Sequence, residues 1–98
     1  MVQPRGFKAV RARVIAALLC GAYQHEARNH IDVKNLLATG EVSAGELVDI
    51  LRRCDGFGYS CSPLHGGVAI DCHVLRASGW YVKFYFISPT TIFISVHR

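Results

Sequence analysis

The feature that most constrains this chain is a change in the spacing of its apolar residues near Gly56. Before Gly56, apolar residues recur every three or four positions, which is typical of helices packed along one side. After Gly56, apolar and polar residues alternate in three segments, Val68–Leu75, Trp80–Ile87 and Thr91–His97, as in half-buried strands. Strands that follow helices predict an α+β fold, with the helices packed on one face of the sheet.

Three helices are predicted in the first half. The first carries an apolar stripe from Phe7 to Gly21, the second fits Ile31–Thr39, and the third begins at Ser43. Ser43 and Glu46 have the spacing of a capping box, in which each side chain accepts the other residue's backbone N–H. The first helix also has basic residues, which form either an ordinary solvated surface or a contact for a nucleic acid or an acidic partner: Arg5, Lys8, Arg11 and Arg13.

The short connections between the alternating segments predict an antiparallel meander of three to four strands. One face of this sheet is expected to be apolar and covered by the helices, and the other polar and open. The residues predicted to be buried beneath the helices are Val68, Ile70, Val74, Val82, Phe84, Phe86, Ile92, Ile94 and Val96. The residues predicted to share the polar face are Asp71, His73, Tyr81, Lys83, Tyr85, Ser95 and His97.

Length and composition set outer limits on the chain. Its 98 residues are expected to form a single domain, residues 1–98, and a 51% apolar content excludes intrinsic disorder. No apolar run reaches the roughly 18 residues of a membrane span, so we expect no membrane partner. The net charge of +4 is compatible with a polyanionic partner.

The four cysteines raise the questions of disulfides and zinc. The N-terminal basic residues followed by Val14–Cys20 have the order of a secretion signal. However, charges interrupt this stretch and no cleavage-site pattern follows it, so a secretion signal is not expected. We therefore expect a cytoplasmic protein with reduced cysteines. The candidate zinc ligands are Cys54, Cys61, His65, Cys72 and His73. Their spacing, C-x6-C-x3-H-x6-C-H, lacks the C-x2-C pair that is usual in zinc sites. Its last two members, Cys72 and His73, are neighbours on a strand and point to opposite faces, so no metal is expected.

The predicted polar face combines imidazole, phenol and cationic groups. Such groups can bind and cleave a phosphodiester: His97, His73 or Tyr81 would move protons, while Lys83 and Arg98 would hold the phosphate. In RNA the 2′-hydroxyl can act as the nucleophile, so neither a metal nor a cofactor is required. The alternative for the same residues is an ordinary solvated sheet face.

The C-terminal two-thirds also resembles a known family. The carrying segments, in chain order, are "DVKNLLATGEV", a "YS" pair, an "ID" pair, "WYVKFYFI" and "TIFISVHR". Over roughly residues 30–98 this order is similar to the motility quorum-sensing regulator (MqsR) toxins, which belong to the wider RelE-like group of toxin–antitoxin ribonucleases. The resemblance implies a small RelE-like α+β domain that cleaves mRNA and is neutralised by a cognate antitoxin protein.

The family motifs can be matched to residues of this chain, most of them on the predicted polar face. Its Tyr-x-Lys falls on Tyr81 and Lys83, and its polar pair on the preceding strand falls near Asp71. Its C-terminal lysine is replaced by His97, and its Tyr-Lys-Ser segment falls on Gly58–Ser60, where Tyr59 is present but the lysine is absent. The resemblance therefore implies RNA contacts by Tyr59 and Asp71.

The leading hypothesis is a metal-independent endoribonuclease toxin that acts on mRNA, with an antitoxin as partner. One alternative is a non-catalytic inhibitor of the anti-CRISPR type, encoded by a phage or mobile element. Another is a nucleic-acid-binding module without chemistry. The hypotheses differ in one geometric requirement, because only a nuclease needs its proton-transfer groups to converge.

Overall fold

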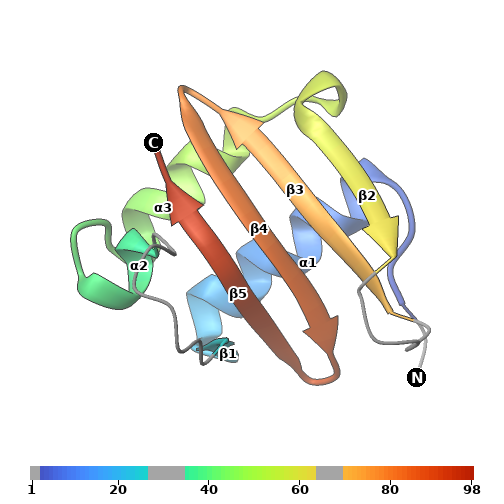
Figure 1. Ribbon diagram of the computed structural model, residues 1–98, viewed down its shortest axis with the longest axis horizontal. Coiled ribbons are helices and arrows are strands. Elements are labelled where there is room, and N and C mark those ends of the chain that lie inside the picture. The colour runs from blue at the N-terminus through green and yellow to red at the C-terminus, as the bar shows by residue number, and fades with distance from the viewer. Residues whose placement is uncertain (1–2, 27–34, 64–69) are drawn as a thin grey trace.

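The computed structural model describes residues 3–26, 35–63 and 70–98 and has the predicted α+β fold class (Figure 1). Helices α1, α2 and α3 span Phe7–Cys20, Leu36–Thr39 and Ala44–Arg52. Strands β1 to β5 span Tyr23–His25, Tyr59–Pro63, Asp71–Ala77, Trp80–Ile87 and Thr90–His97. A 3-10 turn, Gly56–Gly58, leads into β2.

The sheet is mixed, with the strand order β1-β5-β4-β3-β2. The antiparallel meander of β2 to β5 agrees with the prediction, but a sheet of only three or four antiparallel strands is wrong. The additional strand β1 pairs parallel with β5, from Tyr23 opposite Thr91 to His25 opposite Phe93. Because β1 has only three residues, it is too short for an alternating pattern to reveal it.

Helices α1 and α3 cover one face of the sheet, and α1 packs against α3 (Figure 1). The apolar stripe predicted for the first helix is the side of α1 that is buried: Val10, Val14, Ala17 and Leu18. Gly21 ends this helix in the left-handed conformation, at φ 78°, which a residue without a Cβ adopts at low cost.

The predicted capping box at the start of α3 is confirmed. The Ser43 hydroxyl accepts the Glu46 N–H at 3.1 Å, and the Glu46 carboxylate accepts the Ser43 N–H at 3.1 Å. The second predicted helix is present as α2 from Leu36, and Asn35 caps it by accepting the Ala38 N–H at 3.0 Å. Residues 31–34 of that prediction lie outside the described residues.

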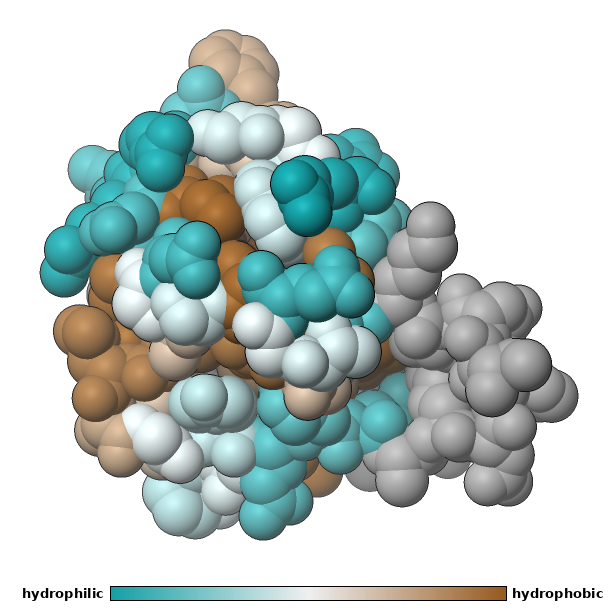
Figure 2. Space-filling model, turned by 90° about the vertical axis from the view of Figure 1, so that its left-hand side faces the viewer, coloured by the Kyte–Doolittle hydropathy of each residue, from teal (hydrophilic) through white to brown (hydrophobic). Residues whose placement is uncertain are grey.

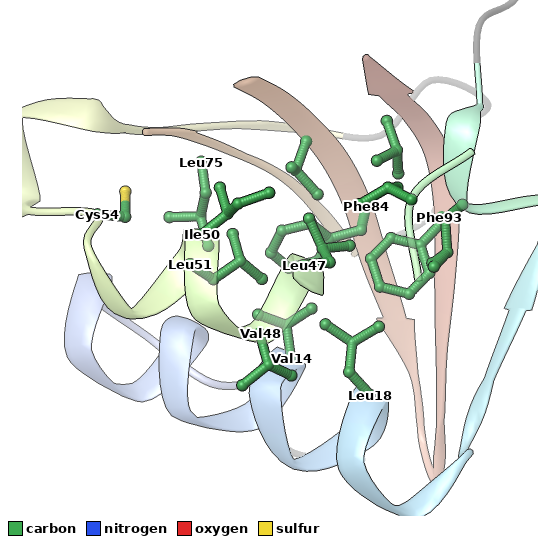
Figure 3. Packing of buried hydrophobic residues seen from close by; sticks show 14 of the residues in the cluster. Val14, Leu18, Leu47, Val48, Ile50, Leu51, Cys54, Leu75, Phe84 and Phe93 are labelled. Atoms are coloured by element: carbon green, nitrogen blue, oxygen red, sulfur yellow. The ribbon is translucent and has the colours of Figure 1, made fainter. Parts of the chain in front are cut away.

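The core lies between the two long helices and the covered sheet face (Figure 3). Val14 and Leu18 of α1 and Leu47 of α3 point toward Phe84 and Phe93 of the sheet (Figure 3). Large aromatic and aliphatic side chains of this kind stabilise a domain mainly by the apolar area that they remove from water. Within the described residues, no helix is long and apolar enough to span a membrane.

The predicted face of β3 is wrong, and the hairpin turn explains why. Ser78 and Gly79 form a two-residue turn with positive φ values of 53° and 81°, the kind of turn that matches the twist of paired strands. Such a turn pairs Leu75 with Val82 and His73 with Phe84. Leu75 and His73 therefore lie on the covered face, together with Val82 and Phe84, the side chains of β4 that were correctly predicted to be buried.

The predicted faces of the first half of β5 are also wrong, and here the cause is a β-bulge. The register of β5 against β4 shifts between Lys83 and Phe84, because one extra residue is inserted in β5. Val96 therefore remains on the covered face as predicted, whereas Phe93 replaces Ile92 there.

The nine residues predicted to be buried thus divide into three groups. Five are buried: Val82, Phe84, Phe86, Ile94 and Val96. Three are only partly buried: Ile70, Val74 and Ile92. The ninth, Val68, lies outside the described residues.

Candidate functional site

The open face of the sheet carries a row of three polar side chains across β3, β4 and β5. Tyr81 stands directly opposite Arg76 on one side and His97 on the other. The rings of Tyr81 and His97 stack, with centroids 5.0 Å apart and planes 20° apart. The Arg76 guanidinium carbon lies 5.4 Å from the centroid of the Tyr81 ring, within the range of a cation–π interaction.

Lys83 extends this cluster by one row along the sheet. It lies two residues after Tyr81 on the same face, opposite Ser95, and it is half-buried. Further along, the Tyr85 hydroxyl donates to the Glu26 carboxylate at 3.4 Å. The cationic groups of this face are therefore gathered toward the end of β5, while a carboxylate lies toward the other end.

One hydrogen bond determines which nitrogen of His97 can accept a proton. His97 Nδ1 lies 3.2 Å from the backbone carbonyl oxygen of Arg98. Because a carbonyl oxygen only accepts, Nδ1 must donate, so the lone pair of the neutral imidazole resides on Nε2. His97 therefore has a base at Nε2, next to the hydroxyl-bearing ring of Tyr81.

Arg98 lies at the end of the sheet rather than over the open face. Its guanidinium carbon is 5.1 Å from the centroid of the Trp80 ring. Both residues line a cavity of about 280 Å³ beside α3, together with Glu41, Glu46 and Asp49. Figure 2 shows this side of the molecule, where mostly hydrophilic side chains leave small apolar patches between them.

His73 lies on the opposite face from His97 and is buried, with 1% of its surface exposed. Its Nδ1 is 3.0 Å from the Tyr59 hydroxyl, and the two rings stack with centroids 5.9 Å apart. Burial lowers the pKa of His73, although the nearby Asp71 carboxylate partly opposes this shift. The prediction that His73 shares a solvated face with His97 is therefore wrong, and it cannot replace His97 there.

Tyr59 and Asp71 belong to this covered side as well. Burial, reinforced by Cys61 and Asp71, raises the pKa of Tyr59 to about 12. With His73, these three residues line a cavity of about 370 Å³. The structure thus divides the predicted site: Tyr81, Lys83 and His97 come together on the open face, and Tyr59, Asp71 and His73 come together on the other.

Arg76 is a member of the open-face row that sequence reasoning missed. Its signal was the Ser78–Gly79 pair, because a two-residue turn places the residue two positions before it opposite Tyr81. A longer connection from Arg76 to Gly79 was predicted instead, and it left Arg76 unassigned.

All four cysteines are free, with Cys54 and Cys72 buried and Cys20 and Cys61 exposed. Among the described residues, no group of three or more His, Cys, Asp or Glu side chains is arranged to hold a metal. Residue 65, the central histidine of the zinc spacing considered above, lies outside those residues.

Comparison with known proteins adds no relative, since no family model, curated protein or solved structure matches the chain.

Proposed function

We propose that this protein is an endoribonuclease that cleaves single-stranded RNA on the open face of its sheet. The observation that carries the proposal is the stacked pair of Tyr81 and His97, with the Nε2 lone pair of His97 available as a base. Lys83 and Arg76 lie next to this pair and supply positive charge. A proton acceptor, a proton donor and cations side by side are what cleavage of a phosphodiester requires.

In the proposed reaction, the RNA supplies its own nucleophile. The 2′-oxygen attacks phosphorus while its proton passes to His97 Nε2. The bond from phosphorus to the 5′-oxygen breaks, and the Tyr81 hydroxyl donates a proton to that oxygen. The products are a 2′,3′-cyclic phosphate and a 5′-hydroxyl end, and proton exchange with water restores Tyr81 and His97.

We assign to Lys83 the role of stabilising the negative charge that develops on the phosphate oxygens. Its ammonium group is a compact cation carried by the central part of a paired strand, so it stabilises this charge electrostatically. Arg76, which forms the β3 end of the row, is assigned a neighbouring phosphate. Arg98 takes no part in this assignment, because its guanidinium lies over Trp80 beside α3. Aromatic faces beside these cations also suit stacking with unpaired bases.

The resemblance to the RelE-like toxins supports a narrower form of this proposal. In that form the substrate is mRNA, the protein acts in the cytoplasm, and a cognate antitoxin neutralises it. His97 would take the place of the family's lysine. An imidazole exchanges protons near neutral pH more readily than an ammonium group does, so this replacement is compatible with catalysis.

A binding role without cleavage is the second candidate, and one observation favours it. Of the histidines in the described residues, His97 is the only one on the open face, since His25 and His73 belong to the covered side. A surface that only binds RNA needs cations and aromatic rings but no proton transfer. A non-catalytic inhibitor of a host nucleic-acid machine would use the same surface.

Cleavage of a labelled RNA, with and without EDTA, separates these candidates. We expect cleavage that EDTA leaves unchanged and products with 2′,3′-cyclic phosphate ends. The cleavage rate of His97→Ala should be about 10²-fold lower than that of the wild type. His25→Ala is the matched control, because it removes an exposed histidine away from the row. RNA that binds but stays intact, or equal rates for His97→Ala and wild type, would contradict the nuclease and support the binding role.

Lys83→Ala tests the phosphate contact in the same assay. We expect weaker RNA binding and a salt dependence reduced by about 0.7 in log–log slope, the value for one phosphate contact on a single strand. An unchanged slope would mean that Lys83 touches no phosphate. The free energy of unfolding should change little, because Lys83 lies outside the hydrophobic core.

A further inference from the structure

Phe57 is the most exposed large apolar side chain of the described residues, with 99% of its surface accessible. It lies in the turn Gly56–Gly58, which leads from α3 into β2 at the edge of the sheet (Figure 1). Single apolar residues are common on protein surfaces, so exposure alone indicates no function. What distinguishes Phe57 is how its turn is held and which groups lie beside it.

The backbone of this turn is held on two sides. The Asp55 carboxylate accepts the Phe57 N–H at 3.0 Å and the Gly58 N–H at 3.2 Å. Toward β3, the Cys54 thiol donates to the Arg76 carbonyl oxygen at 3.2 Å, and a Cβ on Gly58 would overlap the same oxygen. The Phe57 ring is therefore presented to solvent from a fixed backbone, so a ligand that binds it has little chain to order.

The turn also lies next to the open-face row. Arg76, against which Gly58 packs, stands opposite Tyr81, and Tyr81 stands opposite His97. Because β2, β3 and β4 are neighbours and paired strands lie about 4.8 Å apart, the turn is about 10 Å from Tyr81. An RNA strand covers that distance with about three nucleotides, at a rise of about 3.4 Å each.

Arginines outnumber carboxylates around the turn. Arg11 of α1 donates to the backbone carbonyl oxygen of Cys54, just before the turn, at 2.8 Å. The arginines that flank or contact the turn are Arg11, Arg52, Arg53 and Arg76, and the carboxylates are Asp49 and Asp55. This balance favours an anionic ligand, and aromatic rings beside arginines suit single-stranded nucleic acids.

No apolar patch surrounds Phe57 among the described residues. The other exposed large apolar side chains there are Leu19 and Ile87. Leu19 is about 18 Å along α1 from Phe7, whose ring lies beside the turn, and Ile87 is about 20 Å along β4 from Tyr81. A protein interface usually has a contiguous apolar centre, whereas a base stacks on a single ring. The surroundings therefore favour a nucleic acid over a partner protein.

We propose that Phe57 stacks on an unpaired base of an RNA strand that lies along the open-face row, about three nucleotides from the phosphate at Tyr81 and His97. This contact rests on the proposed function for its ligand, RNA, but not on cleavage, since a surface that only binds RNA would use it as well. Phe57 fixes where the strand lies and takes no part in proton transfer.

Binding of a short 2′-O-methyl oligonucleotide tests this contact, because a strand without a free 2′-hydroxyl cannot be cleaved by the proposed reaction. We expect Phe57→Ala to weaken binding about tenfold, a loss typical of one stacked base, and Phe57→Tyr to bind within about twofold of the wild type because it keeps the ring. Leu19→Ala is the matched control, since it removes an exposed apolar side chain away from the row, and it should leave binding unchanged. The free energy of unfolding should not change in Phe57→Ala, because the ring lies outside the hydrophobic core.

Two further readouts separate stacking from a charge contact. The slope of log affinity against log salt concentration should be unchanged in Phe57→Ala, whereas Lys83→Ala should reduce it. In a series of oligonucleotides with one abasic position each, one position should weaken binding to the wild type but not to Phe57→Ala.

Equal affinities of Phe57→Ala and the wild type would overturn the stacking contact and assign the exposed ring to a partner protein instead. A loss shared by Phe57→Ala and Leu19→Ala, or an abasic series that Phe57→Ala does not alter, would also overturn it. RNA that binds but stays intact contradicts only the nuclease, and a wild type that does not bind RNA overturns both proposals, so the failures are distinguishable.

Discussion

Replacement of His73 by alanine is expected to destabilise the protein, because the buried imidazole packs among aromatic rings of the sheet. The imidazole packs against Tyr59, Phe84 and Phe86, with ring centroids 5.9, 5.7 and 5.4 Å away. Removal of a buried ring costs about 3 kcal/mol, the low end for aromatic residues, because imidazole is smaller than phenyl. The lost bond to the Tyr59 hydroxyl adds about 1 kcal/mol. Removal of the buried Nε2, which has no partner among the described residues, offsets about 1–3 kcal/mol of this loss, so we expect a net loss of about 1–3 kcal/mol.

His73→Phe separates packing from polarity at the same position. A phenyl ring preserves the contacts with the three aromatic neighbours but loses the bond to Tyr59, which costs about 1 kcal/mol. It also removes the buried Nε2, which has no hydrogen-bond partner among the described residues. Such an unpaired atom costs the wild type about 1–3 kcal/mol, and His73→Phe recovers this free energy. We therefore expect His73→Phe to have a free energy of unfolding within about 1 kcal/mol of the wild-type value.

The pH dependence of stability gives a second readout for His73. Burial holds the pKa of His73 below its ordinary value of 6.5, so the unfolded chain takes up a proton at a pH where the folded chain does not. Stability is therefore fully present above pH 6.5 and falls as the pH is lowered through that value. Partial desolvation of the ring also lowers the pKa of His25, although this residue is largely exposed, so His73→Phe should reduce this decline but not abolish it.

Urea unfolding at pH 7.5 and at pH 5.5, monitored by circular dichroism, measures both effects. The reasoning would be refuted if His73→Ala cost less than about 1 kcal/mol, or if the wild type became more stable at the lower pH. An equal decline with pH in His73→Phe and wild type would show that the buried imidazole is not its source.

Three further changes test the fold by urea unfolding at neutral pH. Leu75→Ala should lower the free energy of unfolding by about 2–5 kcal/mol, because Leu75 is fully buried. Val74→Ala should lower it by about 1 kcal/mol or less, because Val74 lies on the open face. Equal losses for the two variants would contradict the register of β3. Gly58→Ala should destabilise strongly, since an added Cβ would overlap the Arg76 carbonyl oxygen and lie 3.2 Å from a buried sulfur, and wild-type stability would show that the turn can move. Ser43→Ala should cost about 1 kcal/mol through loss of the cap of α3, and no loss would mean that this cap is dispensable.

Local patterns in the sequence determine the fold class and most of the elements of this protein. The helical stripe of α1, the capping box at Ser43 and Glu46, and the bounds of β4, Trp80–Ile87, can all be read from the sequence. Each depends on residues within a few positions of one another, and such spacing is visible in a linear chain. The same reasoning identifies Tyr81, Lys83 and His97 as side chains of one face.

The tertiary structure alone decided which side chains of β3 and of the first half of β5 share a surface with those of β4. A two-residue turn set the register of β3 and turned His73 inward, and a single inserted residue in β5 exchanged Ile92 for Phe93 on the covered face. A shift of one residue moves every side chain of a strand to the opposite face, so a small error in a connection divides a predicted site in two. The parallel pairing of β1 with β5, which lie more than sixty residues apart in the chain, leaves no local signal, because it depends on long-range packing that only the folded chain provides.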